Sequence, residues 1–390
     1  MTAYPSKLNT NSESYASNRA EMLALVDELH ALKDRARQLS ERRRPRFVER
    51  GQLTPRERLA TLLDPGMPFL ELYGLANYMV DVADREKSVP GASALSGIGF
   101  VNGVRCMIYA SDSGIAAGAM MQKTGEKLRG CLDAALALNL PFIHLVESAG
   151  ANLMKYQVES WAHGGGGFYR LAQLSAAGIP TFVVLHGPST AGGAYFPGMS
   201  DYVIGIKGRG RASLGGAALV RAATGEISDE EELAGAEMHA TTTGSVEYLA
   251  EDDAHGLLMA RDVIGGLGWN NRCPKPERAP YVEPVHDPDD IAGLVPVDYR
   301  RPYDVREVIA RLVDGSEFED FKPRYGASVV CLQAKIFGQA VGIVGNNGPI
   351  DPDGATKAAH FFQLCDQAGM PLILLNNITG YMVGKDYEQA

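Results

Sequence analysis

An internal repeat constrains the fold of this 390-residue chain more than any other feature of its sequence. The segment LPFIHLVESAG at 140–150 returns as MPLILLNNITG at 370–380, an offset of 230 residues. Upstream, GVRCMIYA at 103–110 matches GQAVGIVG at 338–345, an offset of 235 residues. Such self-similarity indicates one structural unit used twice. The second copy would lack the equivalent of residue 181 onward, so we expect two similar halves, the second incomplete.

The pattern within each copy predicts an α/β fold. Asn102-Gly103 is a strong turn signal, and it predicts a hairpin of strands over 97–101 and 104–110. The segments that follow are a helix over 124–138, a buried strand over 142–146, a helix over 169–177 and a buried strand over 181–185. Strands that alternate with helices in this way predict βαβ units and a mostly parallel sheet.

The first fifty residues predict helices. Apolar residues recur every three or four positions between 18 and 38, which is typical of an amphipathic helix. Thr54-Pro55-Arg56-Glu57 has the form of a capping box, so a second helix is expected over 58–63. The arginine-rich stretch 35–58 could hold phosphates, but its interleaved glutamates favour a solvated helix face.

Seven prolines between residues 270 and 303 mark the best linker candidate, because proline blocks both helices and central strands. We therefore expect four segments. They are an N-terminal helical segment (1–52), a first domain (53–270), a linker (271–303) and the first part of a second domain (304–390).

Composition excludes several classes of protein. A formal net charge of -10 disfavours a general nucleic-acid binder. The longest apolar runs fall far short of the roughly 18 residues that a membrane helix needs. Residues 1–17 lack the basic start and apolar core of a secretory signal, so a cytoplasmic location is expected. The five cysteines are isolated from one another and show no metal-ligand spacing, so no metal is expected.

Two loops after predicted buried strands, 147–152 and 186–195, are rich in small residues. Small residues at strand ends let backbone amides approach a ligand oxygen, which suits an oxyanion hole. Close packing of a helix on a strand is the alternative reading. Ser189 nearly matches a nucleophile elbow, but no histidine stands out as its base. His163 could act as an acid or base, although capping of a turn is the favoured role.

At these loops the sequence resembles a known family, the carboxyltransferase (beta) subunits of biotin-dependent acyl-CoA carboxylases. The segments that carry the resemblance are SAGANL at 148–153, LSAAGIP at 174–180, TAGGAY at 190–195, LGGAALVRAATGE at 214–226, YDVREVI at 303–309 and NITGYMVG at 377–384. The segment LGGAALVRAATGE is most similar to the methylcrotonyl-CoA and geranyl-CoA carboxylase type, although Ala217 and Ala218 replace two prolines.

The resemblance implies two crotonase-like halves, each a ββα superhelix of the ClpP/crotonase kind, with acyl-CoA on the first half and biotin on the second half of a partner subunit. It implies a ligase that forms a carbon–carbon bond: carboxybiotin, carried by a biotin carboxylase/biotin carrier (alpha) subunit, gives its carboxyl group to an acyl-CoA. The full-length family forms homo-hexamers. No metal, nucleic acid or membrane is implied.

The resemblance also implies roles for particular residues. The amides of Ala149 and Gly150 would form an oxyanion hole, for the thioester by preference. The residues expected to contact substrate are Ser148, Ala151, Gly192, Gly193, Ala194, Tyr195, Gly215 and Gly216. A second hole would lie in the missing equivalent of 192–194, so we expect the 390 residues alone to be inactive. The alternatives are a non-catalytic or truncated subunit, or another crotonase-type CoA enzyme or hydrolase.

Overall fold

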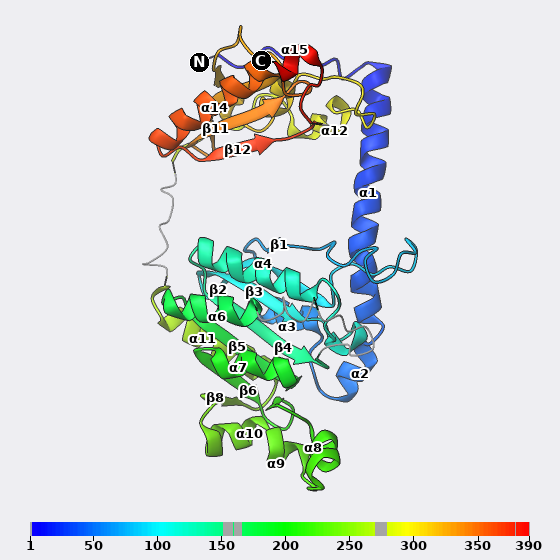
Figure 1. Cartoon of the computed structure of the whole chain (residues 1–390), viewed down its shortest axis with the longest axis vertical. Coiled ribbons are helices and arrows are strands. Elements are labelled where there is room, and N and C mark those ends of the chain that lie inside the picture. The colour runs from blue at the N-terminus through cyan, green and yellow to red at the C-terminus, as the bar shows by residue number, and fades with distance from the viewer. Residues whose placement is uncertain (1, 151–158, 160–165, 270–278, 379, 390) are drawn as a thin grey trace. The chain divides into compact units, whose positions relative to one another are not determined.

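The structure is a computed structural model that describes residues 2–150, 159, 166–269, 279–378 and 380–389. The chain forms two compact units (Figure 1). The large unit comprises His30–Lys275, and the small unit combines Met1–Leu29 with Pro276–Ala390. The helix α1 (Glu13–Glu41) contributes residues to both units. The domain boundaries expected at residues 52, 270 and 303 stay predictions.

Among the described residues, the large unit contains an eight-stranded sheet in the order β1-β2-β3-β4-β5-β6-β8, with β7 paired to β5. Its strands are β1 (Leu70–Glu71), β2 (Ala94–Val101), β3 (Val104–Ser111), β4 (Phe142–Ser148), β5 (Thr181–Thr190), β6 (Tyr202–Ile206), β7 (Arg211–Ser213) and β8 (Tyr248–Ala250). The hairpin of β2 and β3 turns at Asn102 and Gly103, whose φ angles of 47° and 76° are those of a type I′ turn. From β3 to β8 the pairs are parallel. The predicted hairpin and parallel sheet are confirmed.

The helices of the large unit follow the sequence signals. They are α2 (Arg44–Glu49), α3 (Pro55–Leu62), α4 (Thr124–Ala137), α6 (Gly166–Ala176), α7 (Tyr195–Met199), α8 (Ala217–Thr224), α9 (Glu230–Ala234), α10 (Ala236–Met238) and α11 (Asp253–Gly266). The capping box is confirmed: Thr54 Oγ1 accepts from the Glu57 amide at 3.3 Å, and Glu57 Oε2 accepts from the Thr54 amide at 2.9 Å. On the sheet α4 packs against α6, whereas α3 packs against α11 (Figure 1).

The core of the large unit forms around β3, β4 and β5. Residues 142–147 of β4 are all buried, as are residues 181–187 of β5. Strands that bury both faces are typical of a parallel sheet covered by helices. Full burial of each such Ile, Leu, Val or Phe side chain contributes about 1.5–3 kcal/mol, so this run anchors β4 and β5 in the core.

The strand β5 is longer than the sequence indicated. Residues 186–190 were expected to form a loop, because they begin a stretch rich in small residues, but they continue the strand to Thr190. They do so because Pro188, Ser189 and Thr190 pair in parallel with Arg211, Ala212 and Ser213 of β7. That partner strand lies more than twenty residues downstream, so no local signal marks it.

The small unit repeats the start of the large one. Its sheet has the order β12-β11-β10-β9 among the described residues. The elements are α12 (Ile291–Leu294), α13 (Val305–Ile309), β9 (Phe318–Asp320), β10 (Val329–Ile336), β11 (Gln339–Asn346), α14 (Pro352–Gln367), β12 (Leu372–Leu375) and α15 (Lys385–Glu388). The proline-rich stretch thus includes the short helix α12.

Strand register confirms the internal repeat. Ala94 of β2 pairs with Ser111 of β3, and Val329 of β10 pairs with Asn346 of β11, which are the same two positions shifted by 235. Phe142 pairs with Met107 as Leu372 pairs with Gly342. The described residues contain no helix with the length and apolarity to cross a bilayer. Nor do they contain a cluster of three or more His, Cys, Asp or Glu side chains suited to a metal ion.

Candidate functional site

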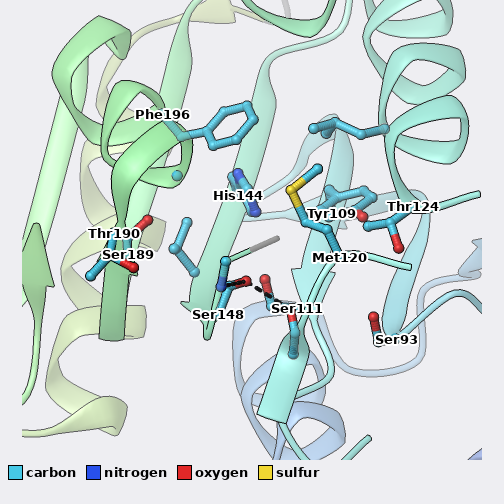
Figure 2. Close-up of a pocket in the computed structure, with 15 residues that line it drawn as sticks. Ser93, Tyr109, Ser111, Met120, Thr124, His144, Ser148, Ser189, Thr190 and Phe196 are labelled. Atoms are coloured by element: carbon cyan, nitrogen blue, oxygen red, sulfur yellow. Dashed lines mark hydrogen bonds between the residues drawn. The ribbon is translucent and has the colours of Figure 1, made fainter. Parts of the chain in front are cut away.

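A pocket of about 40 Å³ lies at the carboxyl ends of the parallel strands β4 and β5 (Figure 2). This edge of an open α/β sheet is where ligands usually bind. The residues that line it are Ser93, Tyr109, Ser111, Gly118, Met120, Thr124, Leu128, His144, Val146, Ser148, Gly150, Ser189, Thr190, Gly193 and Phe196. The two predicted loops therefore meet at one cavity.

The pocket gathers some of the predicted site residues. Ser148, Gly150 and Gly193 line it. The remaining members of the two loops, Ala149, Gly192, Ala194 and Tyr195, adjoin these residues in sequence but are not among its lining. Ala151 and His163 lie outside the described residues.

The glycines of the segment LGGAALVRAATGE at 214–226 lie apart from the pocket lining. Gly216 is the N-cap of α8, Gly215 precedes it, and the amide of Ala217 donates to Glu230 Oε1 at 3.0 Å. A substrate contact of Gly215 or Gly216 stays a prediction.

The amides expected to form the oxyanion hole differ in their partners. The Ala149 amide donates to the Ala117 carbonyl at 3.1 Å, an ordinary main-chain pair. The Gly150 amide donates to Ser148 Oγ at 3.1 Å, and that hydroxyl donates to the Gly118 carbonyl at 2.7 Å (Figure 2). A hydroxyl rotates, so the Gly150 amide can change its acceptor, whereas the Ala149 amide must first leave a carbonyl. Of the two amides, that of Gly150 is the one bonded to a hydroxyl rather than to a main-chain carbonyl, and an oxyanion hole at either stays a prediction.

The loop that supplies Ala117 and Gly118 packs tightly on the end of β4. A methyl group at Gly118 would lie 2.3 Å from the Glu147 carbonyl oxygen, and its φ of +69° also favours glycine. The Met120 amide donates to the Gly150 carbonyl at 2.9 Å. These contacts fix the backbone of 148–150 beside the pocket.

The walls of the pocket carry polar groups that are neutral. Among the described residues, Tyr109 Oη, His144 Nδ1 and Ser189 Oγ are buried and lack a hydrogen-bond partner. The His144 ring lies edge-on to Tyr109 and to Phe196, with centroids 5.1 and 5.0 Å apart (Figure 2). Burial lowers the pKa of His144 to about 3, and burial raises the pKa of Tyr109. Both side chains are therefore uncharged near neutral pH, and the low pKa makes His144 a weak base.

The arrangement argues against a serine hydrolase. His144 and Ser189 do share the pocket, a proximity that the sequence did not suggest. A nucleophilic serine needs a hydrogen bond to its histidine, and that histidine needs an acid on its other nitrogen. Here neither Ser189 Oγ nor His144 Nδ1 has a hydrogen-bond partner among the described residues.

Most of the predicted arginine-rich face is paired or exposed. Arg37 pairs with Asp34, and Arg44 pairs with Glu41 and Glu57. Arg58 does not fit the prediction of a solvated face, because its side chain is only 2% exposed. It lies on the inner side of α3, bound to carboxylates from two other elements.

Comparisons with known proteins show the family of the chain. The carboxyl transferase domain family matches residues 47–390. The chain is 45% identical over 390 residues to a probable biotin-dependent acyl-coenzyme A carboxylase beta2 subunit of Mycobacterium tuberculosis, covering 99% of this chain and 72% of that relative. It is 44% identical over 357 residues to the 3-methylcrotonyl-coenzyme A carboxylase beta1 subunit of the same organism, covering 90% of this chain and 65% of that relative.

Among solved structures, the beta subunit of geranyl-CoA carboxylase from P. aeruginosa superposes with a TM-score of 0.92 at 45% identity. The match covers 99% of this chain and 72% of that chain, so the sequence spans about two thirds to three quarters of these relatives. The likeness confirms the predicted α/β, crotonase-like fold class. The chain belongs to the carboxyl transferase family, as a carboxyltransferase (beta) subunit of the biotin-dependent acyl-CoA carboxylase type.

Proposed function

We propose that this chain transfers a carboxyl group from carboxybiotin on a partner subunit to an acyl-CoA. One observation carries the proposal: among the described residues, the pocket at the ends of β4 and β5 presents the Gly150 backbone among neutral side chains, with no charged residue in its lining. Such a lining can stabilise an enolate oxygen and needs a proton acceptor from elsewhere. In this proposal the proton acceptor comes from a reactant.

When bound, carboxybiotin supplies both the carboxyl group and, through its ureido nitrogen, the base. The chain's own residues bind and orient the acyl-CoA. The Gly150 amide would exchange Ser148 Oγ for the thioester oxygen, whose charge grows as the proton leaves the carbon to be carboxylated, which is the γ carbon in an α,β-unsaturated acyl group. The Ala149 amide would join only if it released the Ala117 carbonyl. Met120, Leu128, Val146 and Phe196 keep water from the reacting carbon.

We propose a branched or unsaturated acyl group as the substrate. The relatives named for 3-methylcrotonyl-CoA and geranyl-CoA support this choice. The apolar walls of a small pocket favour a hydrocarbon chain over a charged one.

A carboxylation assay tests the function. The protein, its biotinylated partner subunit, ATP and labelled bicarbonate are incubated with 3-methylcrotonyl-CoA, geranyl-CoA or propionyl-CoA. The incomplete second copy led us to expect an inactive chain, but the pocket in the large unit supports the opposite outcome, so we expect acid-stable label on at least one of the first two acyl-CoAs. If the partner's biotin is carboxylated but no acyl-CoA accepts the label, the proposal is wrong.

A matched pair of variants connects the activity to the pocket. Gly193→Ala places a methyl group 3.1 Å from Ser189 Oγ, whereas Gly198→Ala meets open space. One methyl group in a substrate pocket changes kcat/KM by about tenfold or more, so we expect that loss for Gly193→Ala alone. Equal activity of the two variants would contradict a substrate role for this pocket.

We further propose a homo-oligomer, up to a hexamer, that binds a biotin carboxylase/biotin carrier subunit and works in the cytoplasm. The exposed side chains of Leu214, Leu219 and Ile227 around α8 support a covering partner, because large apolar side chains cluster there. Light scattering of the purified protein tests the assembly, and cell fractionation tests the location. A monomer at micromolar concentration would contradict the assembly.

A further inference from the structure

Four buried side chains form an ionic network, and some of them are close neighbours in sequence of residues that line the pocket. Arg58 Nη1 donates to Glu147 Oε2 at 2.5 Å, and Arg58 Nε donates to Asp253 Oδ2 at 3.0 Å. His186 Nδ1 lies 2.8 Å from Asp253 Oδ1. All four are buried, and they come from α3, β4, β5 and α11. None of them lines the pocket.

The network coincides with an irregularity between β4 and β5. Val146 pairs with Leu185, but the next pair is Ser148 with Ser189. One residue of β4, Glu147, therefore lies opposite three residues of β5, which begin with His186. A methyl group at the neighbouring Gly187 would lie 2.6 Å from Glu147 Cγ. Irregularities of this kind often lie next to active sites, where they re-aim the residues that follow.

The charges of the network depend on one another. Burial alone would raise the pKa of Asp253, but its contacts with His186 and Arg58 and the Leu53 amide lower it to about 2. Burial and the charge of Arg58 lower the pKa of His186, so its neutral ring donates Nδ1–H to Asp253. Arg58 thus faces two carboxylates, and loss of the arginine would leave both buried carboxylates without their cation. Such a network restrains its four side chains to one arrangement.

We propose that Arg58, Glu147, His186 and Asp253 are positioning residues for carboxyl transfer, which set the loops 148–150 and 189–193 around the pocket. Glu147 directly precedes Ser148, and His186 lies three residues before Ser189. The network therefore connects the two strand ends that supply the pocket's backbone. This inference rests on the proposed function, because it assigns the network a part in that reaction.

Glu147→Gln tests the inference in the carboxylase assembled with its biotin-bearing partner. A misplacement of about 1 Å can cost roughly 100-fold in rate, so we expect kcat to fall about 10- to 100-fold. The KM for acyl-CoA should change less than about threefold, because Glu147 does not touch the pocket.

Asp64→Asn is the matched control, since Asp64 also binds an arginine, Arg261, at 2.8 Å and two backbone amides in the same unit. It should lower the melting temperature without a change in kcat.

A second pair separates positioning from folding. His186→Asn keeps an N–H donor for Asp253, whereas His186→Ala removes it. We expect kcat near that of the wild type for the first and a loss of at least tenfold for the second. If both variants, or Glu147→Gln, keep wild-type kcat, the positioning role is refuted.

Hydrogen exchange gives a readout that needs no activity. The Ala149 amide is bonded to Ala117, so its exchange reports the position of the loop. Glu147→Gln should accelerate exchange at 149, 150 and 187 by about tenfold or more, whereas Asp64→Asn should do so only at 102 and 103. An inactive wild-type protein would contradict the proposed function. Unchanged exchange in Glu147→Gln would contradict this inference by itself.

Discussion

At the scale of single residues, His144 has the chemistry that depends most on its surroundings. It lies in the middle of β4, in the run FIHLV, and it is fully enclosed. Its ring contacts Tyr109, Phe142 and Phe196 edge-on, so it packs as an aromatic residue. Its Nδ1 atom has no hydrogen-bond partner among the described residues. The side chain therefore carries a polar group that the surrounding packing does not use.

Replacing His144 by phenylalanine should not destabilise the protein at pH 7. An unpartnered buried polar group costs about 1–3 kcal/mol, and phenylalanine removes it with a similar shape. We expect the free energy of unfolding, measured in urea, to stay level or to rise. A loss above about 1 kcal/mol would mean that the imidazole has a partner after all.

The same variant should flatten the pH dependence of stability. The unfolded chain binds a proton on His144 near pH 6.5, whereas burial lowers the folded pKa to about 3. Stability is therefore lost as pH falls from 6.5 towards 3, by about 1.4 kcal/mol per unit from this group. Urea unfolding at pH 6.5, 5.5 and 4.5 should show that slope difference between wild type and His144→Phe.

At the scale of elements, the parts with local signals were predictable. The capping box, the Asn102-Gly103 hairpin and α4 each depend on residues within a few positions of one another. The second half of β5 was not predictable, because it forms by pairing with β7, which lies more than twenty residues downstream. Arg58 was read as a surface residue for the same reason: its partner carboxylates are 89 and 195 residues away.

The capping box of α3 supports a matched test. Thr54→Ala removes the side-chain oxygen that accepts from the Glu57 amide, and such a change costs about 1 kcal/mol. Thr61→Ala, in the same helix, removes only a hydroxyl that bonds back to the Glu57 carbonyl, and it should be close to neutral. Urea unfolding measures both. A larger loss for Thr61→Ala would contradict the role given to the cap.

The close approach of Gly118 to β4 supports a second matched test. Gly118 and Gly178 have nearly the same φ, +69° and +68°, but a methyl group at Gly178 meets nothing within 4 Å. Alanine at either position pays about 1–2 kcal/mol of backbone strain. Gly118→Ala must also displace the Glu147 carbonyl, so we expect a larger loss of stability and a loss of carboxylation. Equal effects of the two variants would show that the loop yields without moving β4.

At the scale of the whole molecule, the duplication means that the two units share one pattern of strands and helices. A buried lysine recurs in both copies, Lys127 in α4 and Lys357 in α14, 230 residues apart. Lys127 Nζ donates to the Gly91 and Ala94 carbonyls at 3.1 and 2.6 Å. Lys357 Nζ has no hydrogen-bond partner among the described residues. Equivalent positions thus differ in their energetics.

Methionine at the two lysines should have opposite effects. Lys127→Met leaves two carbonyls without this donor and should cost about 1–3 kcal/mol. Lys357→Met removes an unpartnered buried amine at similar length, so the small unit should keep or gain stability. Hydrogen exchange resolves the units, which need not unfold together. A loss of stability in Lys357→Met would indicate a partner for its amine.

The site itself was predictable in part, and the limit is physical. The repeat and the small-residue motifs pointed to 148–150 and 190–195, and Ser148, Gly150 and Gly193 do line the pocket. Tyr109 and His144 were missed, because a polar residue inside an apolar strand reads as packing until its neighbours are known. A lone histidine within FIHLV was the one signal that could have drawn attention to this wall.

The uneven pairing of β4 and β5 determines on which face of the sheet the later side chains lie. Between the two matched pairs, β4 advances by two residues and β5 by four, so the excess is an even number. Because side chains alternate between the faces of a sheet, an even excess keeps every later residue on its original side. Insertion or deletion of one residue here should move the Ser189 side chain to the opposite face of the sheet, whereas insertion or deletion of two residues should be tolerated.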